Sequence, residues 1–134
     1  MTTRKTTSPF DAAATERQRR MGLIDDDGKA NAGAVSVVAR ACAGMFFDDL
    51  CDYASEDYTM LSTYARLAHL HETAEPRQVF LSVCVAYDEM HRPLPELLWW
   101  ISGSNEIVPL FIGRFMDSLR TILQQIQNEG GAPA

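Results

Sequence analysis

Histidines are the side chains of this sequence best suited to bind a metal ion, and two of them stand in the run His69-Leu70-His71-Glu72. Imidazole and carboxylate are the ligands that zinc and iron commonly use. On a helix, however, residues two apart point about 200° away from each other, so His69 and His71 face different directions. Glu75 also stands where the second histidine of a His-Glu-x-x-His zinc motif would be. We therefore expect no metal site in this run.

Asp88 and His91 form a better helical pair, because residues three apart lie on the same side of a helix and resemble half of the ligand set of a bundle metal centre. Such a centre needs a second half. If the two helices that carry His71 and His91 form a hairpin, these histidines lie on the order of 20 Å apart along the helix axis. Asp48 and Asp52 fall on a line that we expect to be solvated. The pattern predicts neither a metal nor a cofactor.

The acidic run Asp25-Asp26-Asp27-Gly28-Lys29 is typical of a turn in which Gly28 adopts a positive φ. It does not fit a calcium loop, because Leu23 and Ala34 would occupy the first and twelfth positions, where carboxylates are required. It does not fit a phosphate-binding loop either, since Ala30 replaces the serine or threonine. No serine has the flanking glycines of a nucleophile elbow. The sequence therefore contains no catalytic signature.

Charge is distributed unevenly along the chain. The net charge is −6, but residues 1–20 carry +3 and the remainder −9 when their side chains are counted separately. The basic residues of this N-terminal arm are candidate contacts for nucleic acid or for an acidic partner: Arg4, Lys5, Arg17, Arg19 and Arg20. A basic recognition helix is missing, because the helix predicted after Pro76 is apolar and acidic. We expect an arm that is unfolded or docks on the acidic body more readily than one that contacts DNA.

Length and composition indicate one globular domain: 134 residues, 46% hydrophobic and 22% charged. No apolar run approaches the roughly 20 residues of a membrane-spanning helix, and no apolar segment follows the basic N-terminus as in a secretory signal. Cys42, Cys51 and Cys84 are odd in number and lie in apolar stretches, which favours reduced core residues. We expect a soluble cytoplasmic protein without membrane contact.

Apolar residues recur with a period near 3.6, which predicts an all-α fold. We expect an irregular bundle of four to five helices in residues 31–128, preceded by a flexible basic arm and turn (1–30) and followed by a disordered tail (129–134). The arm includes a marginal helix over residues 11–22. The helices of the bundle are predicted over residues 31–54, 57–73, 76–91, 95–102 and 105–128.

The helix predicted over residues 31–54 is apolar almost all round. Its main stripe is Val35, Ala39, Cys42, Phe46, Leu50 and Tyr53, and a second set widens it: Val37, Ala41, Phe47 and Cys51. Only a narrow polar line remains, formed by Ser36, Arg40, Gly44, Asp48 and Asp52. Such a helix must be central in the fold or covered by a partner. The next helix, in contrast, is amphipathic, with a predicted apolar face of Leu61, Tyr64, Ala65, Ala68 and His71.

The last helix has the most regular apolar seam, which supports helix pairing. The seam is Val108, Ile112, Phe115, Leu119, Ile122 and Ile126, and its polar side is Arg114, Asp117, Thr121, Gln124 and Asn128. The preceding segment places Leu97, Leu98, Trp99, Trp100 and Ile101 in succession. Because five consecutive residues cannot share one helical face, this segment is either wedged between helices or partly exposed as a contact patch.

These apolar features favour a non-enzymatic interaction protein, a homo-oligomeric adaptor, inhibitor or regulator that forms a homodimer or binds another protein. The predicted contact residues are Leu98, Trp99, Trp100, Phe111, Phe115 and Leu119. Two alternatives stay open. One is a nucleic-acid-associated transcriptional regulator that uses the basic arm, and the other is a bundle enzyme that binds a small ligand or a metal.

Overall fold

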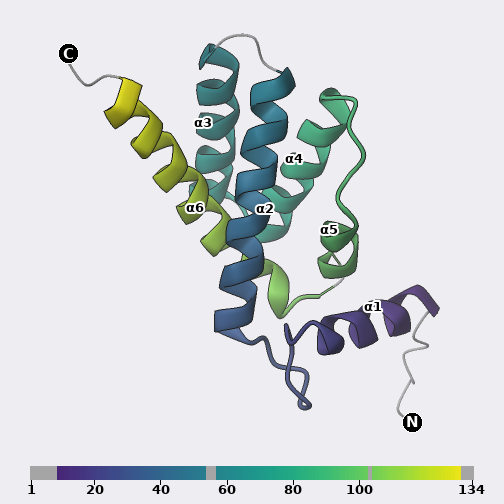
Figure 1. Ribbon diagram of the computed structural model, residues 1–134. Helices are drawn as coiled ribbons and strands as arrows, with labels where there is room; N and C mark the ends of the chain where they lie inside the picture. The colour runs from purple at the N-terminus through teal and green to yellow at the C-terminus, as the bar shows by residue number, and fades with distance from the viewer. Residues whose placement is uncertain (1–8, 54–56, 103, 131–134) are drawn as a thin grey trace.

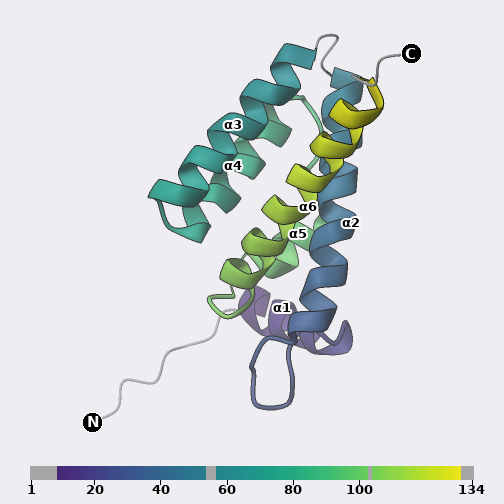
Figure 2. The same cartoon turned by 90° about the vertical axis from the view of Figure 1, so that its left-hand side faces the viewer.

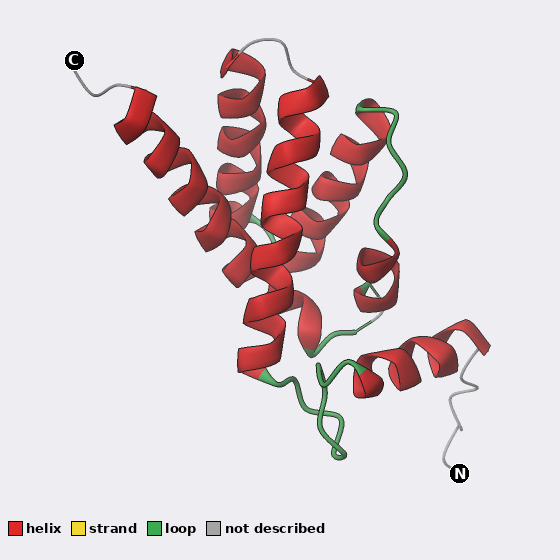
Figure 3. Ribbon diagram, in the orientation of Figure 1, coloured by secondary structure: helices red, strands yellow, loops and turns green. Residues whose placement is uncertain are grey.

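The computed structural model describes residues 9–53, 57–102 and 104–130, and within them it shows helices joined by loops, with no strand beyond one bridge between Ile24 and Ala30 (Figure 3). The predicted all-α bundle is confirmed. The helices are α1 (Pro9–Arg20), α2 (Ala32–Tyr53), α3 (Asp57–Thr73), α4 (Pro76–Glu89), α5 (Glu96–Ile101) and α6 (Ile107–Gly130) (Figure 1).

The long helices begin where side chains satisfy their first backbone N–H groups. The Asn31 side chain accepts a hydrogen bond from the backbone N–H of Ala34 at 3.1 Å, and the Ser104 hydroxyl accepts one from Ile107 at the start of α6, also at 3.1 Å. Pro109 lies in the first turn of α6, where its missing N–H has no helical partner to lose. Helix ends agree with the predicted ranges to within two residues.

A tight turn joins α3 to α4. Glu75 and Gln78 form a capping box, and Pro76 occupies the first position of α4. The helix ends at Glu89, two residues before the predicted end, because His91 adopts a φ of 56°. In Figure 2 this antiparallel pair lies on one side of the molecule and the α2–α6 pair on the other.

The core lies where α2 packs against α6, with α4 closing it. Phe46 of α2 meets Tyr87 of α4 and Phe115 of α6, with ring centroids 5.6 and 5.7 Å apart. Phe111 stacks on Phe115 at 5.7 Å and meets the edge of Phe80 at 6.2 Å. These tilted and stacked pairs are favourable aromatic geometries. Aromatic packing therefore joins three of the helices into one unit.

The buried face of α3 differs from the predicted one. Thr63 and Leu67 are buried, whereas Leu61, Ala65 and His71 are exposed. The prediction omitted Leu67, whose side chain is completely buried. Because α3 packs against both α4 and α6, these neighbours determine its rotation, and its own weak amphipathic pattern does not.

Part of the predicted flexible arm and turn of residues 1–30 forms a helix, α1, that contacts the bundle. Helix α1 packs against α5, buries Ala14 and Gln18, and the Gln18 side chain donates a hydrogen bond to the Trp100 carbonyl. Leu23, after the Gly22 turn, is completely buried and anchors the segment to the core. Helix α1 has no amphipathic pattern, and the burial of Ala14, Gln18 and the following Leu23 holds it to the bundle. Residues 1–8 lie outside the described residues.

The acidic turn forms as predicted. The Asp25 carboxylate accepts hydrogen bonds from the backbone N–H groups of Asp27 and Lys29, both at 2.9 Å, and Gly28 has a φ of 83°. The loop is thus held by its own aspartate, with backbone geometry that favours glycine.

No helix within the described residues combines the length and the apolar character that crossing a bilayer requires.

Candidate interaction surfaces and a polar groove

Four of the six predicted contact residues lie in the core, which corrects the prediction that they form an outer surface. Leu98, Phe111, Phe115 and Leu119 are each at most 3% exposed. The apolar seam of α6 packs against α2 of the same chain. Helix α2 is the one whose apolar stripe predicted a central position or a covering partner. Each helix therefore covers the other, and most of the seam is not available to a second molecule, although Ile126 near its end is 43% exposed.

The two tryptophans take different positions. The Trp99 side chain is 53% exposed, whereas Trp100 is half-buried and its indole N–H donates a hydrogen bond to Glu96 at 2.9 Å. The Trp100 carbonyl is also the acceptor for Gln18 of α1. The segment therefore combines the two predicted alternatives, a buried wedge and a partly exposed patch: Leu98 and Ile101 are buried, and Trp99 is exposed.

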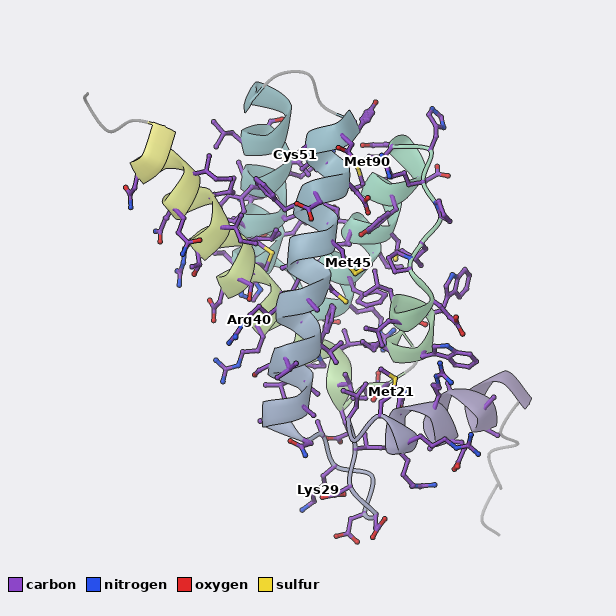
Figure 4. All side chains as sticks on the ribbon, viewed as in Figure 1. Met21, Lys29, Arg40, Met45, Cys51 and Met90 are labelled. Atoms are coloured by element: carbon purple, nitrogen blue, oxygen red, sulfur yellow. The ribbon has the colours of Figure 1, made fainter. Side chains whose placement is uncertain are left out.

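One side of α2 remains uncovered. Val37 is 65% exposed and Met45 is 48% exposed, and Ala41 between them is exposed as well. These three residues recur every fourth position, so they form one ridge, which we call the outer strip of α2. Figure 4 shows Met45 on the side of α2 away from α6. The predicted second apolar set is therefore mostly a surface, since Cys51 is also exposed and only Phe47 is half-buried.

The basic residues of the arm are largely occupied by a neighbour. Arg19 and Arg20 both contact Glu16 on α1, at 3.4 and 3.1 Å, and Arg17 has no partner among the described residues. Exposed pairs of this kind are weak, so they would yield to a stronger acidic partner. Arg4 and Lys5 lie outside the described residues.

The described residues contain no group of three or more histidine, cysteine and acidic side chains that could hold a metal ion. His69, His71 and His91 are all exposed. Asp49 and Asp52 contact a guanidinium.

That guanidinium belongs to Arg92, which joins the loop after α4 to α2. It contacts Asp49 at 3.2 Å and Asp52 at 3.3 Å. The same Asp49 lies beside Tyr87, a residue that is only 2% exposed. Burial raises the pKa of Tyr87 well above its ordinary value, and the Asp49 carboxylate raises it further. Tyr87 thus remains neutral in a cluster that we call the Asp49 clamp (Asp49, Asp52, Tyr87 and Arg92).

No disulfide joins the cysteines of the described chain. Burial raises the pKa of Cys42 to about 11 and also raises that of Cys84. A thiol with a raised pKa is a weak nucleophile at neutral pH, so the geometry does not favour a catalytic role for either residue.

A groove of about 510 Å³ lies between α2 and α6. Its α2 side consists of Ser36 and Arg40, and Figure 4 shows Arg40 on the side of α2 that faces α6. Its α6 side consists of Arg114, Asp117, Ser118, Thr121, Ile122 and Gln125. Seven of these eight side chains are polar. We call it the arginine groove.

Sequence reasoning identified most of these residues as polar lines but did not predict the groove. Ser36 and Arg40 belong to the narrow polar line of one predicted helix, and Arg114, Asp117 and Thr121 belong to the polar side of another. The lines meet because α2 and α6 pack along their apolar stripes, which places the adjoining polar residues side by side. The sequence feature that could have predicted the groove was the position of Arg40 and Arg114, each next to the apolar stripe of its helix in an acidic protein.

Comparison of the chain with models of protein families, with curated protein sequences and with solved structures gives no match. The class that the fold defines is an all-α helical bundle.

Proposed function

We propose that this chain is a non-enzymatic helical interaction protein of the cytoplasm, a homo-oligomeric adaptor, inhibitor or regulator, in which two copies pair through the outer strip of α2. The observation that carries the proposal is the 65% exposure of Val37, which continues through the exposed Ala41 and Met45, on a long helix whose opposite side is buried. A surface helix normally presents polar residues to water, so an apolar ridge on the outer side favours a partner.

The shape of the strip favours a second copy of the same chain. Val37, Ala41 and Met45 form a ridge of residues four apart, and ridges of this type interdigitate when two helices cross at about −50°. If the crossing is centred on Ala41, Val37 of one copy faces Met45 of the other, and the reverse contact is identical. The contact is then closed and symmetric, as in most homodimers. The small Ala41 side chain allows the two backbones to approach closely.

The charge distribution also agrees with pairing through this strip. Two copies with a net charge of −6 each repel one another. The strip itself contains no charged side chain, and the charges that border it are of both signs, Arg40 and Asp48. Because salt screens the repulsion, we expect dimerisation to strengthen with ionic strength.

The proposal is tested by sedimentation velocity of the full chain over about 1 to 100 µM, a range in which moderate affinities are resolved. We expect a concentration-dependent dimer that Val37→Glu abolishes. Leu81→Glu is the matched control, because Leu81 is similarly exposed (56%), lies on α4 and receives the same charge. A monomer throughout the range, or an equal effect of both substitutions, would overturn the proposal.

A further inference from the structure

We propose that the arginine groove between α2 and α6 binds a small phosphate-bearing molecule, with Arg40 and Arg114 as the residues that hold the phosphate group. This site is separate from the outer strip of α2 and does not depend on dimerisation. The groove has a volume of about 510 Å³, which is the size of ordinary small-molecule sites.

The pairing of the other arginines distinguishes these two. Within the described chain, six arginines contact a carboxylate, a carbonyl or an amide oxygen: Arg19, Arg20, Arg66, Arg77, Arg92 and Arg120. Arg40, Arg114 and Arg17 have no such contact. In a chain with more acidic than basic residues, unpaired guanidiniums are the exception. Two of the three line the same groove.

The groove also keeps a positive balance. Its lining holds two guanidiniums and one carboxylate, that of Asp117, and Asp117 already contacts Arg120 at 3.5 Å. Arg40 and Arg114 therefore face a ligand site whose only acid is shared with a third arginine. Guanidiniums present paired N–H donors that match the oxygens of phosphate. Two guanidiniums suit a ligand group with two negative charges, such as phosphate, better than a carboxylate group with one.

The remaining lining residues supply a polar complement. The hydroxyls of Ser36 and Ser118 have no hydrogen-bond partner within the described residues and could donate to phosphate oxygens. Gln125 and the Asp117 carboxylate offer acceptors for hydroxyl groups of the ligand. Thr121 is already engaged, because its hydroxyl donates to the Asp117 carbonyl at 3.0 Å. The lining thus fits a phosphate ester that also carries hydroxyl groups, such as a sugar phosphate.

The test is a titration of the full chain with ribose 5-phosphate at constant ionic strength, followed by amide chemical shifts in two-dimensional NMR. We expect saturable shifts around Ser36, Ser118 and Thr121 with a Kd near or below about 1 mM. Arg40→Gln and Arg114→Gln should each raise the Kd by about tenfold. Arg17→Gln is the matched control, since it removes the third unpaired arginine from outside the groove and should leave the Kd unchanged.

Further ligands separate phosphate recognition from general charge attraction. Inorganic phosphate should compete for the same shifts, whereas ribose alone should not bind. The absence of saturable shifts, an equal loss with Arg17→Gln, or equally tight binding of succinate would each overturn the proposal. Arg40→Lys keeps the charge and should retain part of the binding, which excludes misfolding as the cause of the Arg40→Gln effect. Met45→Glu, which places a charge in the outer strip five residues away from Arg40, should bind as tightly as the wild type, so failure of either proposal is distinguishable from failure of the other.

Discussion

The two flanks of α2 place similar polar residues in opposite circumstances. On the flank towards α4, the carboxylates of Asp49 and Asp52 contact the guanidinium of Arg92, and Asp49 lies beside the buried Tyr87. On the flank towards α6, Arg40 and Arg114 line an open groove without acidic partners of their own. The first flank uses its charges to attach a loop, whereas the second leaves them available.

Burial explains the difference. A polar group that is removed from water requires a protein partner, and Tyr87 is almost fully buried. Side chains in an open groove are hydrated, so they are stable without partners and can exchange water for a ligand. The comparison suggests that polar residues of the Asp49 clamp stabilise the fold and that those of the arginine groove serve binding.

The strongest test of this comparison is removal of the residue between the flanks. Phe46→Ala deletes the ring that contacts both Tyr87 and Phe115, so it should destabilise both sides together. We expect a loss of about 3–5 kcal/mol in the free energy of unfolding, measured with urea. Val37→Ala on the exposed side of the same helix should change it by less than about 0.5 kcal/mol. Similar losses for both variants would show that α2 is not buried as described.

Alkaline pH should weaken the clamp side through groups that burial keeps protonated. The Cys42 thiol has an ordinary pKa of 9.0 and a pKa of about 11 in the fold, so the unfolded chain loses this proton first. The stabilisation is complete below pH 9 and is lost as the pH rises towards 11, by about 3 kcal/mol for this thiol. Tyr87 adds to the same trend above its ordinary pKa of 10.0. Cys42→Ala should flatten the dependence of unfolding free energy on pH, and an unchanged slope would contradict this assignment.

Removal of the central carboxylate should distinguish the clamp from ordinary surface charge. Asp49→Ala removes the carboxylate that contacts Arg92 and lies beside the buried Tyr87, and it should cost about 1–3 kcal/mol. Asp48→Ala, one position away and exposed, is the matched control and should have almost no effect on stability. Thermal and urea unfolding of the two variants measure the difference. Equal stability would show that the Asp49 clamp is only a surface ion pair.

The smallest effect on stability is expected in the arginine groove. Arg40→Gln and Arg114→Gln should change the free energy of unfolding by less than about 0.5 kcal/mol, because neither guanidinium has a partner to lose among the residues that the structure describes. Calorimetry with and without phosphate measures the binding role of the two arginines. Phosphate should raise the thermal stability of the wild type and not that of either variant. A large loss of stability without phosphate would assign these arginines to the fold.

Local sequence signals predicted the helices well and their surfaces less well. Asn31, Pro76 and the apolar period of 3.6 place the helix ends within two residues, because caps and prolines act on adjacent backbone. The same period did not reveal which apolar residues are covered. Phe111, Phe115 and Leu119 are predicted contact residues and are buried, whereas Val37 and Cys51, predicted to widen the apolar stripe of a central or partner-covered helix, are exposed.

The candidate sites show the same limit. The arginines and serines of the groove were visible only as polar lines on two separate helices, and nothing local indicates that these lines meet. The anchoring of α1 was also hidden, since it depends on one glutamine side chain and the Trp100 carbonyl 82 residues away. Such contacts depend on how helices cross, which periodicity does not encode.

By itself, the sequence determined an all-α protein with particular helix boundaries, a closed acidic turn and no catalytic or metal signature. These properties depend on residues close together in the chain, where capping, turn chemistry and helical period operate. The tertiary structure alone decided that α6 covers α2, that the outer strip of α2 stays uncovered, and that Arg40 and Arg114 share a groove. Packing decides these points because burying the largest apolar area selects the partner of each helix, and every exposed surface follows from that choice.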